Sequence, residues 1–384
     1  MKVNTAIVLI FLSIFGSFAQ ELAEVKHLML ASKALQQNRE ILIYTPQSYK
    51  ENYLTQYEVV YVFDAHTREF FDLTHSMISF LSRADKQYIV VGITSPYNEE
   101  LDYSRRNDFL PEMQTEAARK ANGKYCGNAD KFFQFVTQEV FSYMQENYRV
   151  LSRRSAIGHS LGASFLVYSF LKNPDTFDNY VLMSPNLAYD SNRLMRELKQ
   201  FDFSTIKPYK YIYLSFANEA VSFPEWKPAI DESFVLFDSL QGKENFYVKS
   251  ARFPESNHFS SALPALTAAL STYFTQVYDR QQAQLSTTFV EVEVVVEVSN
   301  PKAELYITGN QKAVGNWNPA AVKMNRLTDK ERSIKLKVQS PFIFKITQGS
   351  WESEATLEGV SGNVCLHPSN EKRYRFKAIA FAND

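Results

Sequence analysis

The sequence predicts a chain of class α/β, in which a mostly parallel sheet with helices on both faces precedes a small all-β sandwich domain. Two observations lead to this prediction. From about residue 24 to residue 278, short apolar segments alternate with amphipathic ones, as is typical of parallel strands buried under helices. After residue 278 nearly every segment alternates with period two, which indicates strands with one buried face.

The first region, residues 20–278, is expected to form one large domain. Its clearest strands are expected at residues 40–44, 57–63, 88–93, 180–183 and 211–217, with a further short strand that runs into Gly158. Its clearest helices are expected at residues 129–148, 161–172 and 262–278. Asn173-Pro174 ends the second of these helices, because proline cannot continue one.

The second region is separated from the first by a polar segment, DRQQAQLSTT, that we predict to be a linker at residues 279–288. Residues 289–384 then form the predicted β-sandwich domain. Its strands are expected at residues 289–298, 304–308, 333–338, 342–347 and 374–378.

The N-terminus has the pattern of a signal peptide at residues 1–19. Lys2 precedes an apolar stretch, and Ser17-Phe18-Ala19 resembles a small-x-small cleavage site before Gln20. The apolar stretch is short for a membrane span. We therefore expect an exported protein, periplasmic or extracellular, without a stable membrane anchor; the alternative is an uncleaved anchor.

Composition excludes several classes of protein. A formal net charge of -1 gives no basic field, so nucleic acid is not an expected partner. The two cysteines, Cys126 and Cys365, are too few for a disulfide scaffold, and their neighbours do not have the spacing of a zinc site. Neither a metal nor a cofactor is expected.

The stretch AIGHSLGASF carries the candidate nucleophile. Gly158-His159-Ser160-Leu161-Gly162 matches G-x-S-x-G, with an expected strand before it and an expected helix after it. Small residues permit the sharp turn that holds such a serine at the top of a sheet, beside a helix N-terminus. We predict that Ser160 is a nucleophile; the alternative is a serine that only serves the turn.

A serine nucleophile needs a base, and His258 is the remaining candidate after elimination. In proteins with this turn the chain order is serine, acid, histidine. The other histidines are excluded by position: His27, His66 and His75 precede Ser160, His159 lies inside the turn, and His367 lies in the second region.

The acid that orients His258 is expected after the strand at residues 211–217, where Glu219 is the first choice. Glu225, Asp231 and Asp190 compete with it.

A tetrahedral intermediate also needs two backbone N–H donors for its oxyanion. We expect one from Leu161 and the other from Ala65 or His66, in the turn after the strand at residues 57–63.

Residues 24–278 resemble the α/β-hydrolases that include enterochelin-type siderophore esterases, feruloyl esterases and S-formylglutathione hydrolases. The resemblance rests on REILIYTPQSY, VVYVFDAHTREFF, IVVGI, NADKFFQFVTQEVFSYMQENY, AIGHSLGASF and YLSFANE…NHF. It implies the α/β-hydrolase fold and hydrolysis of carboxylic esters. The chain departs from the usual pattern at Ala65, where a glycine is usual, and at Ala163, where a second glycine is usual.

The stretch YSRRNDFLP resembles a segment that lies near the site mouth in that family. Arg105 and Arg106 are therefore candidate contacts for an anionic or catechol-like substrate, together with His159. The alternative for the two arginines is an ordinary solvated loop.

The second region resembles carbohydrate-binding modules of the starch-binding (CBM20) kind, on ELYITGNQKAVGNWNPAAVKM and FIFKITQGSWESE. The resemblance implies that Trp317 and Trp351 stack on sugar rings of an α-glucan. In the alternative, Trp317 is a buried structural residue and the domain is a spacer.

Three functions follow from these features. The leading expectation is a secreted serine esterase that forms an acyl-enzyme on Ser160 and is targeted to glycans by its second domain. An acyltransferase with the same three residues is the first alternative. A non-catalytic glycan-binding protein is the second alternative.

Overall fold

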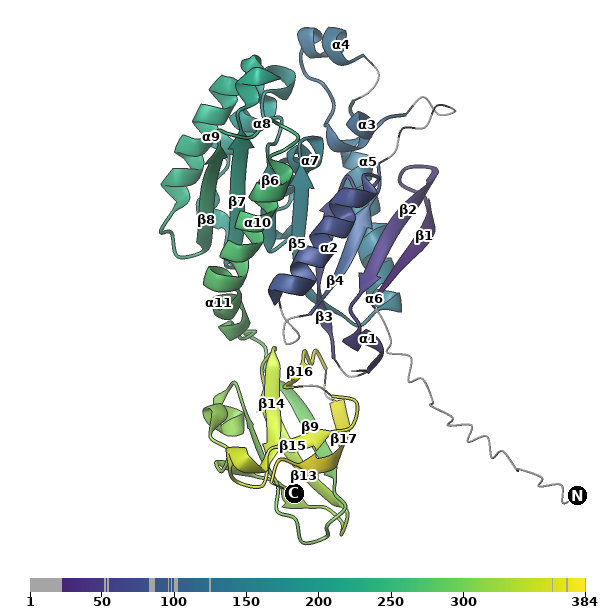
Figure 1. Ribbon diagram of the computed structural model, residues 1–384, viewed down its shortest axis with the longest axis vertical. Coiled ribbons are helices and arrows are strands. Elements are labelled where there is room, and N and C mark those ends of the chain that lie inside the picture. The colour runs from purple at the N-terminus through teal and green to yellow at the C-terminus, as the bar shows by residue number, and fades with distance from the viewer. Residues whose placement is uncertain are drawn as a thin grey trace, which may run out of the picture.

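The computed structural model describes residues 23–384, except positions 52, 54, 83–86, 96, 98, 100–102, 124–125, 361, 371 and 384 (Figure 1). The predicted signal peptide lies outside the described residues. Among the described residues, no helix combines the length and the apolar character needed to cross a bilayer.

The larger part of the molecule is built on one eight-stranded sheet. Its strands are β1 (Glu24–Ser32), β2 (Gln37–Thr45), β3 (Tyr57–Phe63), β4 (Tyr88–Ile93), β5 (Val150–His159), β6 (Asn179–Met183), β7 (Lys210–Ala217) and β8 (Phe246–Phe253), in the spatial order β1-β2-β4-β3-β5-β6-β7-β8. The six strands β4, β3, β5, β6, β7 and β8 pair with one another in parallel, and β2 is antiparallel to both of its neighbours, β1 and β4. The prediction of a mostly parallel sheet is therefore confirmed.

Helices cover both faces of this sheet (Figure 1). They are α1 (Ser48–Glu51), α2 (Arg68–Ser82), α3 (Arg105–Phe109), α4 (Glu116–Asn122), α5 (Ala129–Gln134), α6 (Phe141–Asn147), α7 (Leu161–Lys172), α8 (Tyr189–Gln200), α9 (Lys227–Leu240), α10 (Ala262–Thr272) and α11 (Tyr278–Ala283). Apolar residues of α2 and α10 form one core with one face of the sheet, and those of α5 to α9 form a second core with the other. Strands buried on both sides explain the continuous apolar runs in the sequence.

Two predicted helices contain an irregular turn. Residues Phe135–Val140 and Tyr273–Val277 are π-helical, and they join α5 to α6 and α10 to α11. Such wide turns are local bulges in otherwise α-helical segments, and no composition signal marks them here.

The predicted linker at residues 279–288 is wrong in its first half, because α11 continues to Ala283. Gln281 is buried, and its side-chain amide donates to Asn179 Oδ1 at 2.7 Å. Arg153 Nη2 donates to the carbonyl oxygen of Gln281 at 2.7 Å. A polar composition was therefore a misleading signal at this point, since these polar groups are bonded inside the fold.

Residues 290–381 form two further sheets around a core of their own. The strands are β9 (Val290–Glu297), β10 (Tyr306–Gly309), β11 (Val322–Lys323), β12 (Asn325–Arg326), β13 (Glu331–Val338), β14 (Phe342–Thr347), β15 (Ala355–Leu357), β16 (Val364–Leu366) and β17 (Lys372–Phe381). Their orders are β11-β10-β14-β16 and β12-β13-β9-β17-β15, and the inward residues share one apolar core. We call residues 290–381 the C-terminal module.

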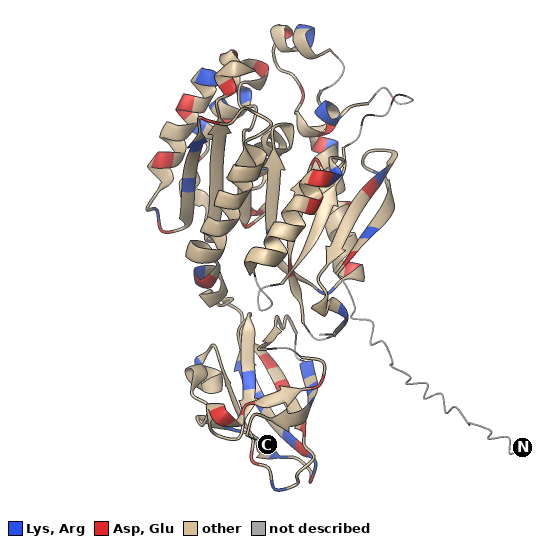
Figure 2. Ribbon diagram, in the orientation of Figure 1, with Lys and Arg blue, Asp and Glu red and all other residues tan. Residues whose placement is uncertain are grey.

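The C-terminal module lies at the amino ends of the parallel strands (Figure 1). The amide of His367 donates to Gln56 Oε1 at 3.3 Å, and Gln56 directly precedes β3. Lys and Arg are interspersed with Asp and Glu over both parts of the chain, in keeping with the small net charge (Figure 2).

Candidate active site

Ser160 lies at a sharp turn between β5 and α7, with φ 57° and ψ −122°. This backbone conformation is strained for any residue with a side chain. Two backbone bonds hold it: the Ser160 amide donates to Met183 O at 2.9 Å, and the Ser164 amide donates to Ser160 O at 3.0 Å. The hydroxyl is thereby fixed at the carboxyl ends of the strands, where open α/β sheets place their ligands.

The two glycines of the turn differ in how much room they have. A Cβ on Gly158 would lie 2.6 Å from the Gly162 carbonyl carbon and 2.7 Å from the Ala163 nitrogen, both backbone atoms of α7. A Cβ on Gly162 would meet Phe63 Cβ at 3.4 Å, an ordinary contact. Close approach of β5 to α7 therefore requires glycine at position 158 only.

Gly158→Ala is expected to lower the free energy of unfolding by about 2–3 kcal/mol, because backbone cannot move aside as a side chain can. Gly162→Ala, at the second position of α7, is expected to change it by less than about 1 kcal/mol. Thermal denaturation of the two variants beside the native chain measures the difference. Equal losses in both variants would contradict this account of the turn.

The structure brings Ser160, His258 and Glu219 into one hydrogen-bonded row. His258 Nε2 lies 2.9 Å from Ser160 Oγ, and His258 Nδ1 lies 2.8 Å from Glu219 Oε2. Because the carboxylate can only accept, Nδ1 carries a proton and Nε2 is left to accept from the serine hydroxyl. His258 and Glu219 are both 2% exposed. These are the geometry and tautomer that a serine–histidine–acid triad requires.

The competing acids are engaged elsewhere. Asp190 accepts from the amides of Gln114 and Thr115 at 2.7 and 3.0 Å. Asp231 is half-buried and pairs with Lys227, and Glu225 is exposed on its short helical turn. Glu219 alone of the four contacts His258.

The environment of Glu219 favours its charged form. Burial, the largest single influence, would raise the pKa of this carboxyl, but the polar groups of His258, Ser184 and Ala217 around it together outweigh burial and the pKa is lowered. The amide of Ala217 donates to Glu219 at 3.2 Å, and the Ser184 hydroxyl lies nearby, short of hydrogen-bonding geometry. Sequence reasoning missed Ser184, which follows β6 at φ 48° and carries no motif.

Two aromatic side chains enclose the imidazole of His258. Phe223 and Trp226 stack on each other with ring centroids 4.4 Å apart and 12° between planes. The planes of both rings are nearly perpendicular to that of His258, at 79° and 85°, with centroids 5.0 and 5.4 Å from its own. Water is thereby kept from this side of the ring, which strengthens the bond between His258 and Glu219.

Of the two oxyanion donors predicted in the turn after β3, Ala65 and His66, the structure favours His66. The amide of Ala65 donates to Ile93 O at 3.1 Å, so the prediction that it could bind an oxyanion is not supported. Among the described residues, the amide of His66 has no such backbone acceptor. The amide of Leu161, at the first position of α7, has no acceptor within its helix.

Arg105 supports that turn from the side. Its guanidinium donates from Nε and Nη2 to the carboxylate of Asp64, at 3.0 and 2.5 Å, and His66 Nδ1 lies 3.0 Å from the same carboxylate. Burial would raise the pKa of Asp64, but its bonds to His66 and Arg105 lower it. Arg105, predicted as a substrate contact, is thus already ion-paired, while Arg106 is exposed.

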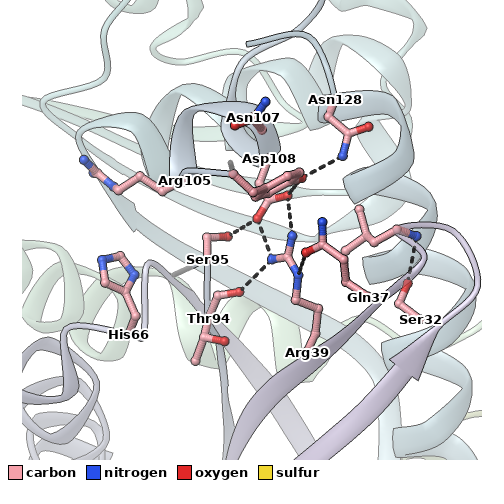
Figure 3. Close-up of polar contacts among 12 residues, drawn as sticks. Ser32, Gln37, Arg39, His66, Thr94, Ser95, Arg105, Asn107, Asp108 and Asn128 are labelled. Atoms are coloured by element: carbon pink, nitrogen blue, oxygen red, sulfur yellow. Dashed lines mark hydrogen bonds and ion pairs between the residues drawn. The ribbon is translucent and has the colours of Figure 1, made fainter. Parts of the chain in front are cut away.

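A buried ion pair anchors α3, which carries Arg105 (Figure 3). Arg39, on β2, donates to both oxygens of Asp108 at 2.6 and 2.9 Å, and the Ser95 hydroxyl donates to Asp108 at 2.7 Å. Arg39 is 2% exposed and Asp108 is not exposed. Both residues were missed, since nothing in a single sequence links positions 39 and 108.

His159, which was also predicted to contact the substrate, contacts the backbone of His258 instead. Its Nε2 is 2.8 Å from the carbonyl oxygen of His258, to which it donates. Burial lowers the pKa of His159 to about 4, so the ring is neutral at neutral pH. It fixes the backbone of the residue whose side chain contacts Ser160.

Trp317 and Trp351 are 37% and 42% exposed on the C-terminal module. A hydrogen bond links the segments that carry them: Thr347 Oγ1, shortly before Trp351, donates at 2.7 Å to the carbonyl oxygen of Pro319, shortly after Trp317. Trp317 is therefore not the buried structural residue of the alternative interpretation.

A mostly parallel sheet covered by helices, with a serine–histidine–glutamate row at the carboxyl ends of its strands, is the arrangement typical of hydrolases of the α/β type. The family described as putative esterase matches residues 32–314, and the chain belongs to that family.

Two curated proteins are similar in sequence to part of this chain. The ferri-bacillibactin esterase BesA of Bacillus subtilis is 24% identical over 223 residues, which are 55% of this chain and 76% of BesA. The siderophore triacetylfusarinine C esterase of Aspergillus fumigatus is 29% identical over 115 residues, which are 29% of this chain and 38% of that enzyme.

Solved structures share the fold. An IroE-like serine hydrolase from Shewanella oneidensis superposes with a TM-score of 0.55 and 22% identity, over 65% of this chain and 80% of that one. The BES protein from Bacillus cereus superposes with a TM-score of 0.53 and 20% identity, over 72% of this chain and 100% of that one.

Proposed function

We propose that this protein is a serine esterase that hydrolyses carboxylic esters through an acyl-enzyme on Ser160. The observation that carries the proposal is the row from Ser160 Oγ through the His258 ring to Glu219, with spacings of 2.9 and 2.8 Å. A neutral serine hydroxyl is a poor nucleophile, and this row supplies the base and the orienting acid that activate it.

The chemistry proceeds in two balanced steps. Ser160 Oγ bonds to the ester carbonyl carbon while His258 Nε2 takes its proton; the C–O bond to the alcohol then breaks, and His258 returns the proton to the leaving oxygen. Water next attacks the acyl-enzyme by the same route, which releases the carboxylic acid and restores the serine. The amides of Leu161 and His66 stabilise the oxyanion in both steps.

Small-molecule esters of the siderophore type are the first natural substrates to try. One curated relative above is named as a ferri-bacillibactin esterase and the other as a siderophore triacetylfusarinine C esterase. The exposed Arg106, next in sequence to the ion-paired Arg105 on α3, offers a positive charge to an anionic substrate of this type. Export, predicted from residues 1–19, would place the enzyme where it meets such ligands and stays a prediction.

The test uses p-nitrophenyl acetate and butyrate with the chain from Gln20. A burst of p-nitrophenol equal to the enzyme concentration, and covalent capture of Ser160 by a fluorophosphonate identified by mass, are the expected results. Absence of both would refute the proposal. Product analysis with an added alcohol separates hydrolysis from acyl transfer.

We further propose that Trp317 and Trp351 bind a glycan. Flat exposed rings fit the apolar faces of sugars, and their loops are held together by the Thr347–Pro319 bond. Because the C-terminal module lies at the strand ends opposite Ser160, it would tether the enzyme rather than line its site (Figure 1). Trp317→Ala with Trp351→Ala is expected to abolish retention on an α-glucan column, with the exposed Phe289→Ala as control. Retention equal to that of the native chain would refute glycan binding at these rings.

A further inference from the structure

Phe259, the residue after His258, is a large apolar side chain that the mechanism above does not use. It is 76% exposed, although its ring centroid lies only 5.3 Å from that of His258, at 84° between planes. It is the one apolar residue in the polar stretch Ser256–Ser261. An exposed phenyl ring gains free energy when another apolar group covers it.

The backbone under Phe259 is held in place. Asn257 Oδ1 accepts from the amides of Phe259 and Ser260 at 3.0 and 2.9 Å, and Ser260 Oγ accepts from the Asn257 amide at 3.0 Å. This reciprocal cap begins the helical winding that continues into α10. Phe259 is therefore a fixed feature of the site and not the end of a loose loop.

Leu263 and Val221 are two further exposed apolar side chains, and together with Phe259 we call them the apolar rim. Leu263 is 54% exposed and lies four residues beyond Phe259 in the same winding, which places both on one face. Val221 is 72% exposed in the turn that follows Glu219, and that turn is bonded to the His258 loop through the Asn218 amide and Ser256 O at 2.9 Å. By contrast, the turn after β3 that carries His66 has charged side chains, those of Asp64 and its ion-paired partner Arg105.

The chemistry decides which part of an ester meets this rim. His258 Nε2 must reach the leaving oxygen to protonate it, so the alcohol part of the substrate lies on the His258 side. We infer that Phe259, with Leu263 beside it, contacts the alcohol part of the ester and selects alcohols that are apolar or carry a ring. This inference rests on the proposed function.

The test compares two acetate esters, 2-phenylethyl acetate and ethyl acetate, in the full chain. Both give the same acetyl-enzyme, so the ratio of their kcat/KM values reports only the alcohol part. Phe259→Ala is expected to lower this ratio about tenfold, and Phe259→Leu to lower it less. Phe80→Ala removes an equally exposed ring (85%) from α2, away from the site, and is expected to keep the native ratio.

Each other outcome has a distinct meaning. An equal fall for both esters would make Phe259 a support for His258 and overturn the inference. An unmoved alcohol ratio with a changed ratio of p-nitrophenyl hexanoate to p-nitrophenyl acetate would assign Phe259 to the acyl part and also overturn it. Ser160-dependent turnover with neither ratio moved refutes only the inference, whereas no Ser160-dependent turnover of any ester refutes the proposed function itself.

Discussion

Ser160→Ala is expected to lower kcat/KM for p-nitrophenyl butyrate by at least about 10⁴-fold. The variant keeps the oxyanion amides and the binding surface, so weak catalysis by water remains, but no acyl-enzyme can form. Glu219→Gln is expected to cost about 10²–10⁴-fold, because the carboxylate that sets the His258 tautomer is replaced by an amide. Steady-state kinetics with a detection range of five decades measures both.

Two comparisons make this result specific. Ser239→Ala removes an exposed hydroxyl at the end of α9 and is expected to keep native activity. Ser160→Gly is expected to unfold at a higher temperature than Ser160→Ala, because glycine adopts φ 57° and ψ −122° without strain. If Ser160→Ala retained more than about one hundredth of the native activity, Ser160 would not be the nucleophile.

Asp108→Asn is expected to lower the free energy of unfolding by about 3–5 kcal/mol. Arg39 is buried, and without the Asp108 carboxylate its charge has no counter-charge within hydrogen-bonding distance among the described residues. Arg39→Met is expected to lower the free energy of unfolding by a similar amount, because it leaves the buried Asp108 carboxylate without its counter-charge. The double variant should cost clearly less than the sum of the two, since it leaves no unpaired buried charge.

Urea denaturation of the single and double variants measures this non-additivity. Glu232→Gln is the matched control, because it breaks an exposed ion pair between Lys199 on α8 and Glu232 on α9, which is worth less than about 1 kcal/mol. A loss in Asp108→Asn no larger than in Glu232→Gln would show that the buried pair does not anchor α3.

Wherever one local pattern was sufficient, the sequence predicted the elements closely. The expected segments at residues 57–63, 88–93 and 161–172 coincide with β3, β4 and α7. Apolar runs between turn residues specify such elements almost without help from the rest of the chain. The prediction of a linker was wrong at its polar start, because Gln281 there is buried and hydrogen-bonded to Asn179 and Arg153. Both partners are more than a hundred residues away in the sequence.

By itself, the sequence determined the layered α/β plan and proposed Ser160 and His258, because a strand–turn–helix motif and the order of residues along a chain are local or countable properties. Only the tertiary structure decided that Glu219 and none of its competitors meets His258, and that Ala65 gives its amide to Ile93. It alone revealed the pairing of Arg39 with Asp108 and the exposed ring beside His258. These are contacts between distant segments, and their geometry depends on how the packed sheet and helices fix each loop, which no single stretch of sequence specifies.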